Sequence, residues 1–376
     1  MTIPRRILLN PGPVTTTIAV KQALMVPDIC HREREFTDLI KTVRRDLLKV
    51  VCVGEDQYTA IPFCASGTGA IEACISSVVA PHQKLAVIQN GTYAQRITAI
   101  AERYHIPVVN IVFPFDEPLV KEVIESVLMK DPDIHYVALV HHETSSGVLN
   151  PLTEIGLICR RLQRCFIVDA MSSYAGVDID MSRDSVDFLI ASANKCLQGM
   201  PGVSFVLAHR ARLLAAKDFA RSFYFDLYQQ YSSLETTGEM PFTPPVQIMY
   251  ALRCALDEYF TETSEARRQR YRRNYICLVA GLQQLGFMCV TPPALQSGLL
   301  VVVRFPVQRE QDEFDFDALH DYLYRKGYTI YPKKLPIPDT FRLSCMGDLT
   351  EKDIQGFLRA LKQYMISRRR MKNHVT

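Results

Sequence analysis

Short apolar segments alternate with amphipathic segments through the first two thirds of the chain, and this alternation is the strongest restriction on its fold. The apolar segments are almost unbroken runs of Val, Ile, Leu, Ala and Phe, whereas the segments between them repeat apolar residues at helical spacing. Such a pattern indicates an α/β fold with a mostly parallel sheet that helices cover on both faces. The expected strands are 58–63, 85–88, 108–112, 136–140, 165–168, 188–191 and 203–208.

The pattern changes near residue 245. Two long helices are expected there, and they are followed by strands and helices that indicate a smaller α+β unit. We therefore expect an N-terminal arm at 1–20, a large domain at 21–255 and a small C-terminal domain at 256–376. Residues 7–14 of the arm form an extended apolar piece that a Pro-Gly-Pro turn stops.

Charge and hydropathy argue against two classes of partner. The formal net charge is only +3, so no strong field favours nucleic acid. The arginines between 267 and 273 alternate with apolar residues, which fits the solvated face of an amphipathic helix better than a nucleic-acid surface. The sequence contains no run of about 18 apolar residues, so we expect no membrane span.

The eleven cysteines predict neither a disulfide framework nor a metal site. Their number is odd, no secretory signal precedes them, and none lies in a CxxC or Cys/His pair at zinc spacing. His141 and His142 are adjacent on a strand and face opposite sides, so they form a poor ligand pair. We expect reduced thiols, a cytoplasmic location and no bound metal.

Polar residues gather where the expected strands end, which is where parallel sheets bind ligands. Asp169 ends one strand, and Lys195 lies on a Gly- and Pro-rich turn after a later one. Ser66, Gly67 and Thr68 join a strand to a helix start, and Tyr93 follows another strand end. Each has an ordinary alternative: Lys195 as a rim residue, Asp169 as a helix cap, and the small-residue turn as a tight connection.

One cofactor accounts for all four positions together, and that cofactor is pyridoxal 5′-phosphate. An amine of lowered pKa at Lys195 would condense with its aldehyde. The carboxylate of Asp169 would hold its ring nitrogen, and the helix start at 66–68 would bind its phosphate. Tyr93 would stack on the ring.

The motifs also resemble a known family, the class-V aminotransferases of fold type I. The resemblance extends from about residue 7 to 365, and within the family it is greatest to the members that act on 2-aminoethylphosphonate and pyruvate. The motifs that carry it are LLNPGPV, ASGTGAIEA, QNGTYAQR, HHETSSGVLNP, FIVDAMSSYAG, SANKCLQGMPG, FTPP and FRLSCMG.

The resemblance implies a role for each matching position. Lys195 binds the cofactor covalently, Asp169 pairs with the ring nitrogen, and Thr144 contacts the ring oxygen. Thr243 reaches the phosphate in the neighbouring subunit, which implies a homodimer. Arg342 binds the substrate carboxylate. The cofactor-binding set is Ser66, Gly67, Thr68, Tyr93, Thr144, Asp169, Lys195 and Thr243.

The implied reaction transfers the amino group of 2-aminoethylphosphonate to pyruvate, and it gives phosphonoacetaldehyde and L-alanine. Arg32 is a candidate partner of the phosphonate on charge alone. Met240 and Asn194 stand where glyoxylate-using relatives often have tyrosine and glutamine. Three alternatives remain: an alanine– or serine–glyoxylate aminotransferase, a non-enzymatic binding protein with this fold, and a nucleic-acid binder that uses the arginine-rich helix.

Overall fold

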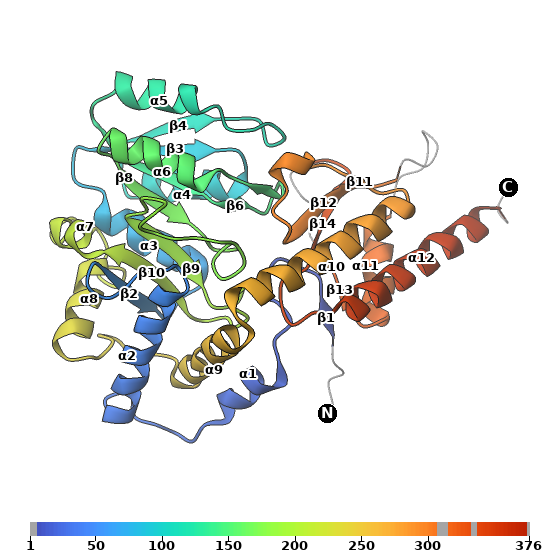
Figure 1. Cartoon of the computed structure of the whole chain (residues 1–376), viewed down its shortest axis with the longest axis horizontal. Helices are drawn as coiled ribbons and strands as arrows, with labels where there is room; N and C mark the ends of the chain where they lie inside the picture. The colour runs from blue at the N-terminus through green and yellow to red at the C-terminus, as the bar shows by residue number, and fades with distance from the viewer. Residues whose placement is uncertain (1–5, 307–314, 332–336, 374–376) are drawn as a thin grey trace.

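The computed structural model describes residues 6–306, 315–331 and 337–373, and these residues form two lobes (Figure 1). The larger lobe is built on a seven-stranded sheet with the order β2-β10-β9-β8-β5-β3-β4. Its strands are β2 Tyr58–Phe63, β3 Lys84–Gln89, β4 Val108–Val112, β5 Ile134–Val140, β8 Cys165–Asp169, β9 Phe188–Ser192 and β10 Ser204–His209.

All neighbouring strands of this sheet are parallel except at β10, which is antiparallel to both β2 and β9. The reason is the short connection between β9 and β10, since a parallel pair requires a crossover of a dozen or more residues. Every residue of β2, β8 and β9 is buried, so both faces of these strands are covered. The α/β fold class expected from the sequence is confirmed.

Helices of the larger lobe lie between and around these strands. Helix α3 packs on β9 and β10, α4 packs on β3, and α6 packs on β8. The helices are α1 Ile18–Gln22, α2 Arg34–Lys49, α3 Gly67–Val78, α4 Thr92–Arg103, α5 Lys121–Lys130, α6 Leu152–Arg161, α7 Arg210–Ala215, α8 Leu227–Thr236 and α9 Val246–Glu262, with the 3-10 turn η1 Ala23–Met25 after α1. A small hairpin, β6 His142–Glu143 with β7 Val148–Leu149, follows β5 at the carboxyl edge of the sheet.

The smaller lobe contains a three-stranded antiparallel sheet of order β11-β12-β14. Its strands are β11 Met288–Cys289, β12 Leu300–Arg304 and β14 Thr340–Ser344, and its helices are α10 Ser264–Gln284, α11 Phe316–Arg325 and α12 Glu351–Asn373, with the 3-10 turn η2 Pro293–Leu295. Helix α10 belongs to both hydrophobic cores, because Tyr271 packs in the first and Tyr275 in the second. The division of the chain at residue 255 stays a prediction.

The N-terminal arm connects the two lobes. Strand β1, Ile7–Leu8, pairs in parallel with β13, Tyr328–Thr329, and so starts in the smaller lobe. The backbone oxygen of Leu9 then accepts a hydrogen bond from the backbone N–H of Ser344 (2.7 Å). The following residues of the arm lead into the larger lobe, where Val14 joins its core.

The arginine-rich helix α10 differs from the expectation. Its arginines were expected on a solvated face, but Arg267 is only 1% exposed. The expectation is therefore wrong for Arg267, because that face of α10 packs against the turn after Lys195, where its guanidinium donates to the backbone oxygens of Cys196 and Leu197. Arg272 and Arg273 do face the solvent.

All eleven cysteines are free thiols, and the cytoplasmic location stays a prediction. Among the helices in the described part of the chain, none has the length and apolar character that crossing a bilayer requires.

Candidate functional site

Lys195 lies on the turn between β9 and β10, at the carboxyl edge of the parallel strands. Burial lowers the pKa of its amine below the usual value, and the positive charge of Arg342 lowers it further, while Tyr93 and Asp169 act in the opposite direction. A lowered pKa leaves a larger fraction of the amine neutral, and a neutral amine can act as a nucleophile or a base. A buried amine of this kind suits the reactive role that the sequence predicts for Lys195, and that role stays a prediction.

Asp169 is the last residue of β8, and it pairs in register with Val140 of β5 and Ile190 of β9. Its side chain is 2% exposed, and its Oδ1 accepts a hydrogen bond from the backbone N–H of Met171 (2.9 Å). Burial raises the pKa of the carboxyl group to about 6, and the negative charge of Glu143 adds to this effect. A buried carboxylate of this kind is stabilised by a cationic ligand group.

The N-terminal arm supplies a residue that the sequence interpretation missed. Gly12 has a φ of +144°, and an added Cβ would lie 2.4–2.6 Å from Cδ, Nζ and Cε of Lys195. The lysine side chain therefore occupies the space that a side chain at residue 12 would fill. The Pro-Gly-Pro sequence was the available signal, but it predicted only a turn.

The start of helix α3 lies close to Asp169. Ser66 is the N-cap residue, and its side chain makes no capping hydrogen bond, which leaves N–H groups of the first turn available to an anion. An added Cβ at Gly67 would lie 2.4 Å from Sδ of Met171, so this turn packs directly against the segment after β8. Nη1 of Arg96 donates to Oγ1 of Thr68 (3.2 Å) and adds a positive charge beside the turn.

Tyr93, Thr144 and Arg342 form a cluster next to Lys195. Nη1 of Arg342 donates to the backbone oxygen of Thr144 (2.9 Å), whereas its buried Nε has no hydrogen-bond partner among the described residues. Burial alone would raise the pKa of the Tyr93 hydroxyl, but the charges of Arg342 and Lys195 and hydrogen bonds with Thr144 and Arg342 lower it. An unpartnered guanidinium N–H is suited to bind an anionic ligand group.

Glu143 holds this cluster together, although the sequence interpretation gave it no role. Its Oε2 accepts hydrogen bonds from the backbone N–H groups of Tyr93 (3.0 Å) and Ala94 (3.3 Å) at the start of α4. Its Oε1 accepts from the backbone N–H (3.1 Å) and the hydroxyl (2.5 Å) of Ser145. This carboxylate thus joins α4 to the hairpin after β5, and a single sequence shows no signal for such a contact.

Two predicted site residues lie apart from this group. Thr243 is exposed on the segment between α8 and α9, and Arg32 forms an ion pair with Glu239. In the described part of the chain, no hydrogen bond or ion pair links either residue to Lys195 or Asp169. Their roles stay predictions.

The arrangement fits pyridoxal 5′-phosphate. It combines a desolvated amine at Lys195, a buried carboxyl group at Asp169 and an uncapped helix start at Ser66–Thr68. These are a group for the aldehyde, a group for the ring nitrogen and a group for the phosphate. The described residues contain no set of three or more His, Cys, Asp and Glu side chains arranged to bind a metal ion.

Replacing Asp169 with Asn tests whether its carboxyl group serves the cofactor at a cost to the fold. Its folded pKa of about 6 exceeds the ordinary value of 3.8, so the folded state binds this proton more tightly than the unfolded state. The protonated Asp169 carboxyl group therefore stabilises the fold fully at a pH below its unfolded pKa, and this stabilisation is lost as the pH rises through about 6. At neutral pH and above, D169N should raise the free energy of unfolding of the cofactor-free chain by on the order of 2 kcal/mol.

The same variant should lose much of the stabilisation that added pyridoxal phosphate gives, as measured by thermal unfolding with and without the cofactor. D184N is the matched control, because hydrogen bonds from Arg183 and Thr153 outweigh burial and lower the pKa of the buried Asp184. The control should destabilise the chain at neutral pH and keep the cofactor effect. Equal cofactor stabilisation of D169N and the unchanged chain would refute the role.

Replacing Gly12 with Ala should prevent Lys195 from holding the cofactor. The added methyl group would overlap the lysine side chain, so the visible absorbance of lysine-bound pyridoxal phosphate should fall after reconstitution. G298A is the control, since Gly298 also has a positive φ (+73°) but nothing lies within 4 Å of its added Cβ. If both variants bind the cofactor equally, the close approach of Gly12 has no functional consequence.

Comparisons with known proteins agree with this geometry. The model of the family described as aminotransferase class-V matches residues 20–356. The chain is 38% identical to a 2-aminoethylphosphonate–pyruvate transaminase of Cupriavidus pinatubonensis over 94% of this chain and 93% of that protein. It is also 38% identical to one of Lysinibacillus sphaericus, over 96% and 97%. The crystal structure of an alanine–glyoxylate aminotransferase from Nostoc sp. superimposes with a TM-score of 0.88, at 25% identity and 96% coverage of both chains. The chain belongs to the class-V aminotransferases.

Proposed function

We propose that this chain is a pyridoxal-phosphate-dependent aminotransferase that transfers the amino group of 2-aminoethylphosphonate to pyruvate, giving phosphonoacetaldehyde and L-alanine. The observation that carries this proposal is the identity of 36–38% with transaminases of that name from several bacteria, over nearly the full length of each protein. The desolvated Lys195 beside Asp169 and Arg342 supports the reaction class.

The bound cofactor supplies an aldehyde that takes up amino groups and a ring that stabilises negative charge. Lys195 has two tasks in this proposal: it holds the cofactor, and its amine moves a proton while the substrate occupies the site. Its lowered pKa suits the second task, because a neutral amine accepts a proton readily. Asp169, as a carboxylate, would accept a hydrogen bond from the ring nitrogen of the cofactor and would favour the protonated form of that nitrogen.

Arg342 is the proposed anion-binding residue. In a ping-pong reaction the two substrates occupy the same place in turn, and each carries an anionic group. The guanidinium lies beside Lys195 and keeps a buried N–H without a partner in the described structure, which leaves it able to bind a carboxylate or phosphonate oxygen. Arg32 receives less support as a phosphonate partner, because it is already paired with Glu239.

A donor screen tests the proposed function. The reconstituted protein should form phosphonoacetaldehyde, measured directly, and L-alanine from 2-aminoethylphosphonate and pyruvate. K195A should lower the turnover at least about a hundredfold, since it removes the proposed proton carrier. Consumption of alanine with glyoxylate, and none of the phosphonate, would show the glyoxylate-dependent alternative instead.

Within the same screen, R342Q should raise the KM of both substrates about tenfold or more, because it removes a charge-assisted hydrogen bond. R304Q is the matched control, since Arg304 lies in the neighbouring strand, opposite Thr340 of β14. A KM that changes equally in both variants, or in neither, would argue against a role of Arg342 in anion binding.

The proposed enzyme acts as a homodimer. An aromatic surface patch supports this: Phe223 is 77% exposed and Tyr224 is 37% exposed, and Phe242, the neighbour of Thr243, stacks on Tyr224 (ring centroids 5.0 Å apart). Exposed aromatic patches of this kind are frequent at protein interfaces. Thr243 is exposed in the single chain, as expected for a residue that acts in a partner's site.

Sedimentation should give a mass of twice 42.7 kDa for the unchanged chain. F223D should shift the distribution toward the single chain, because it places a charge in the aromatic patch. V112D should leave the mass unchanged, since Val112 is similarly exposed (70%) but lies on β4, at the opposite edge of the sheet from β2, beside whose end Tyr224 contacts Cys64. A single-chain mass for the unchanged protein would refute the dimer.

A further inference from the structure

The turn that carries Lys195 is held from behind by helix α10. The Tyr271 hydroxyl donates a hydrogen bond to the backbone oxygen of Cys196 (3.1 Å) and accepts one from Nε2 of Gln198 (2.6 Å). Tyr271 is 0% exposed and Gln198 only 2%, so neither contact is exchanged with bulk water. One hydroxyl group thus contacts two of the three residues that follow Lys195.

Gln198 shows why this turn requires support. Its φ is +65°, a left-handed backbone conformation that costs a non-glycine residue about 1 kcal/mol or more. Its backbone N–H donates to the oxygen of Lys195 (2.9 Å), so the strained residue closes the turn around the lysine. Such a conformation persists where surrounding contacts fix it, and here Tyr271 supplies the buried contact to the side chain.

The charged guanidinium group of Arg267 also binds the backbone of this turn. Its Nη1 donates to the backbone oxygens of Cys196 (3.3 Å) and Leu197 (3.4 Å), and its Nε pairs with Glu262 (2.7 Å). A buried guanidinium is costly to desolvate unless it is paired and hydrogen-bonded, and both conditions are met here.

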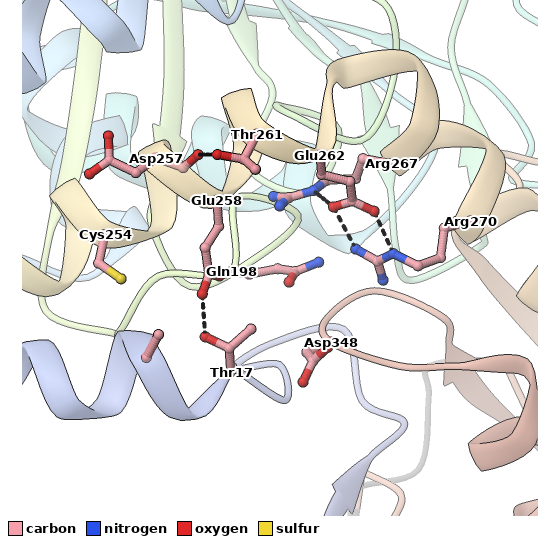
Figure 2. A pocket seen from close by; sticks show the side chains of 11 residues that line it. Thr17, Gln198, Cys254, Asp257, Glu258, Thr261, Glu262, Arg267, Arg270 and Asp348 are labelled. Atoms are coloured by element: carbon pink, nitrogen blue, oxygen red, sulfur yellow. Dashed lines mark hydrogen bonds and ion pairs between the residues drawn. The ribbon is translucent and has the colours of Figure 1, made fainter.

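The same part of α10 also holds the smaller lobe. The Tyr271 hydroxyl accepts a hydrogen bond from the backbone N–H of Gly347 (3.4 Å), and Nη1 of Arg270 donates to the backbone oxygen of Gly347 (2.8 Å). Figure 2 shows the Glu262 carboxylate between the guanidinium groups of Arg267 and Arg270, to which it is paired at 2.7 and 2.6 Å. Gly347 follows β14, the strand that carries Arg342.

These contacts link the two groups on which the proposed reaction depends. On one side α10 holds the backbone directly after Lys195, and on the other it holds the backbone shortly after Arg342. A pocket of about 410 Å³ beside them is lined by Gln198 and Asp348 as well as by Glu262, Arg267 and Arg270 (Figure 2).

We propose that Tyr271 and Arg267 are positioning residues, which fix the turn after Lys195 relative to the Arg342 strand and so keep the amine in its desolvated place. Neither residue touches the substrate in this proposal, and both act through the backbone of residues 196–198. The inference deepens the proposed function, but the placement of Lys195 can be measured without any substrate.

The test compares Y271F with Y275F. Tyr275 lies one turn further along α10, and its hydroxyl donates to Oε1 of Gln296 (2.8 Å) in the smaller lobe, so both variants lose one hydroxyl group on the same helix. In the cofactor-free protein, an amine-acylating reagent and mass spectrometry give the pH midpoint at which Lys195 is labelled. In the holoenzyme, kcat and KM are measured for 2-aminoethylphosphonate and pyruvate.

Y271F should move the labelling midpoint of Lys195 upward, toward that of a solvated lysine, because the turn no longer holds the amine in its buried place. It should also lower kcat on the order of tenfold or more, while KM changes less than about threefold. Y275F should change neither quantity. Equal behaviour of the two variants would overturn the proposal.

R267K and R268K provide a second pair, which tests the role of Arg267 independently. R267K keeps the charge beside Glu262 but loses the N–H that reaches two backbone oxygens, whereas Arg268 pairs at the surface with Asp178 and Glu265. Only R267K should move the labelling midpoint, and thermal unfolding should show both variants folded. If the unchanged protein fails the donor screen, the labelling midpoints still decide this proposal.

Discussion

The structure depends on keeping one lysine amine out of water. Lys195 follows a strand buried on both faces, and its side chain lies against the backbone of Gly12, so its charged form loses hydration that a surface lysine keeps. The charges of the surrounding side chains act on this amine in opposite directions. Burial and Arg342 favour the neutral amine, whereas Tyr93 and Asp169 favour the charged one, and the net effect lowers the pKa of the amine.

The sequence predicted the elements of the larger lobe well because burial on both faces makes a strand a nearly continuous apolar run, as in Tyr58–Phe63, which the structure reproduces without a shift. It also placed Asp169 and Lys195 at strand ends, because the ends of such runs are visible in a single sequence. Gly12, Glu143 and Tyr271 were not predicted as site residues. Their roles come from contacts between segments that are far apart in the chain, and periodicity carries no information about those.

Arg267 is a further residue whose environment could not be predicted from the spacing of apolar residues. The spacing of apolar residues along α10 describes the helix alone, so it marked the arginines as a solvated face. The structure buries Arg267 because the turn after Lys195 covers that face, and pairing with Glu262 compensates its charge. Thr243 remains a prediction from resemblance and Arg32 one from charge alone, since the single chain places Thr243 at its surface and pairs Arg32 with Glu239.

The route of the N-terminal arm has a consequence for biosynthesis. Strand β1 pairs with β13, Leu9 then bonds to Ser344, Gly12 lies against Lys195, and Thr15 bonds to Asp348. Residues 7–15 thus find their binding partners only after residues 328–348 have been translated. The lysine pocket is consequently closed late, and a chain that terminates before residue 328 retains the lysine but lacks the surface on which the arm would dock.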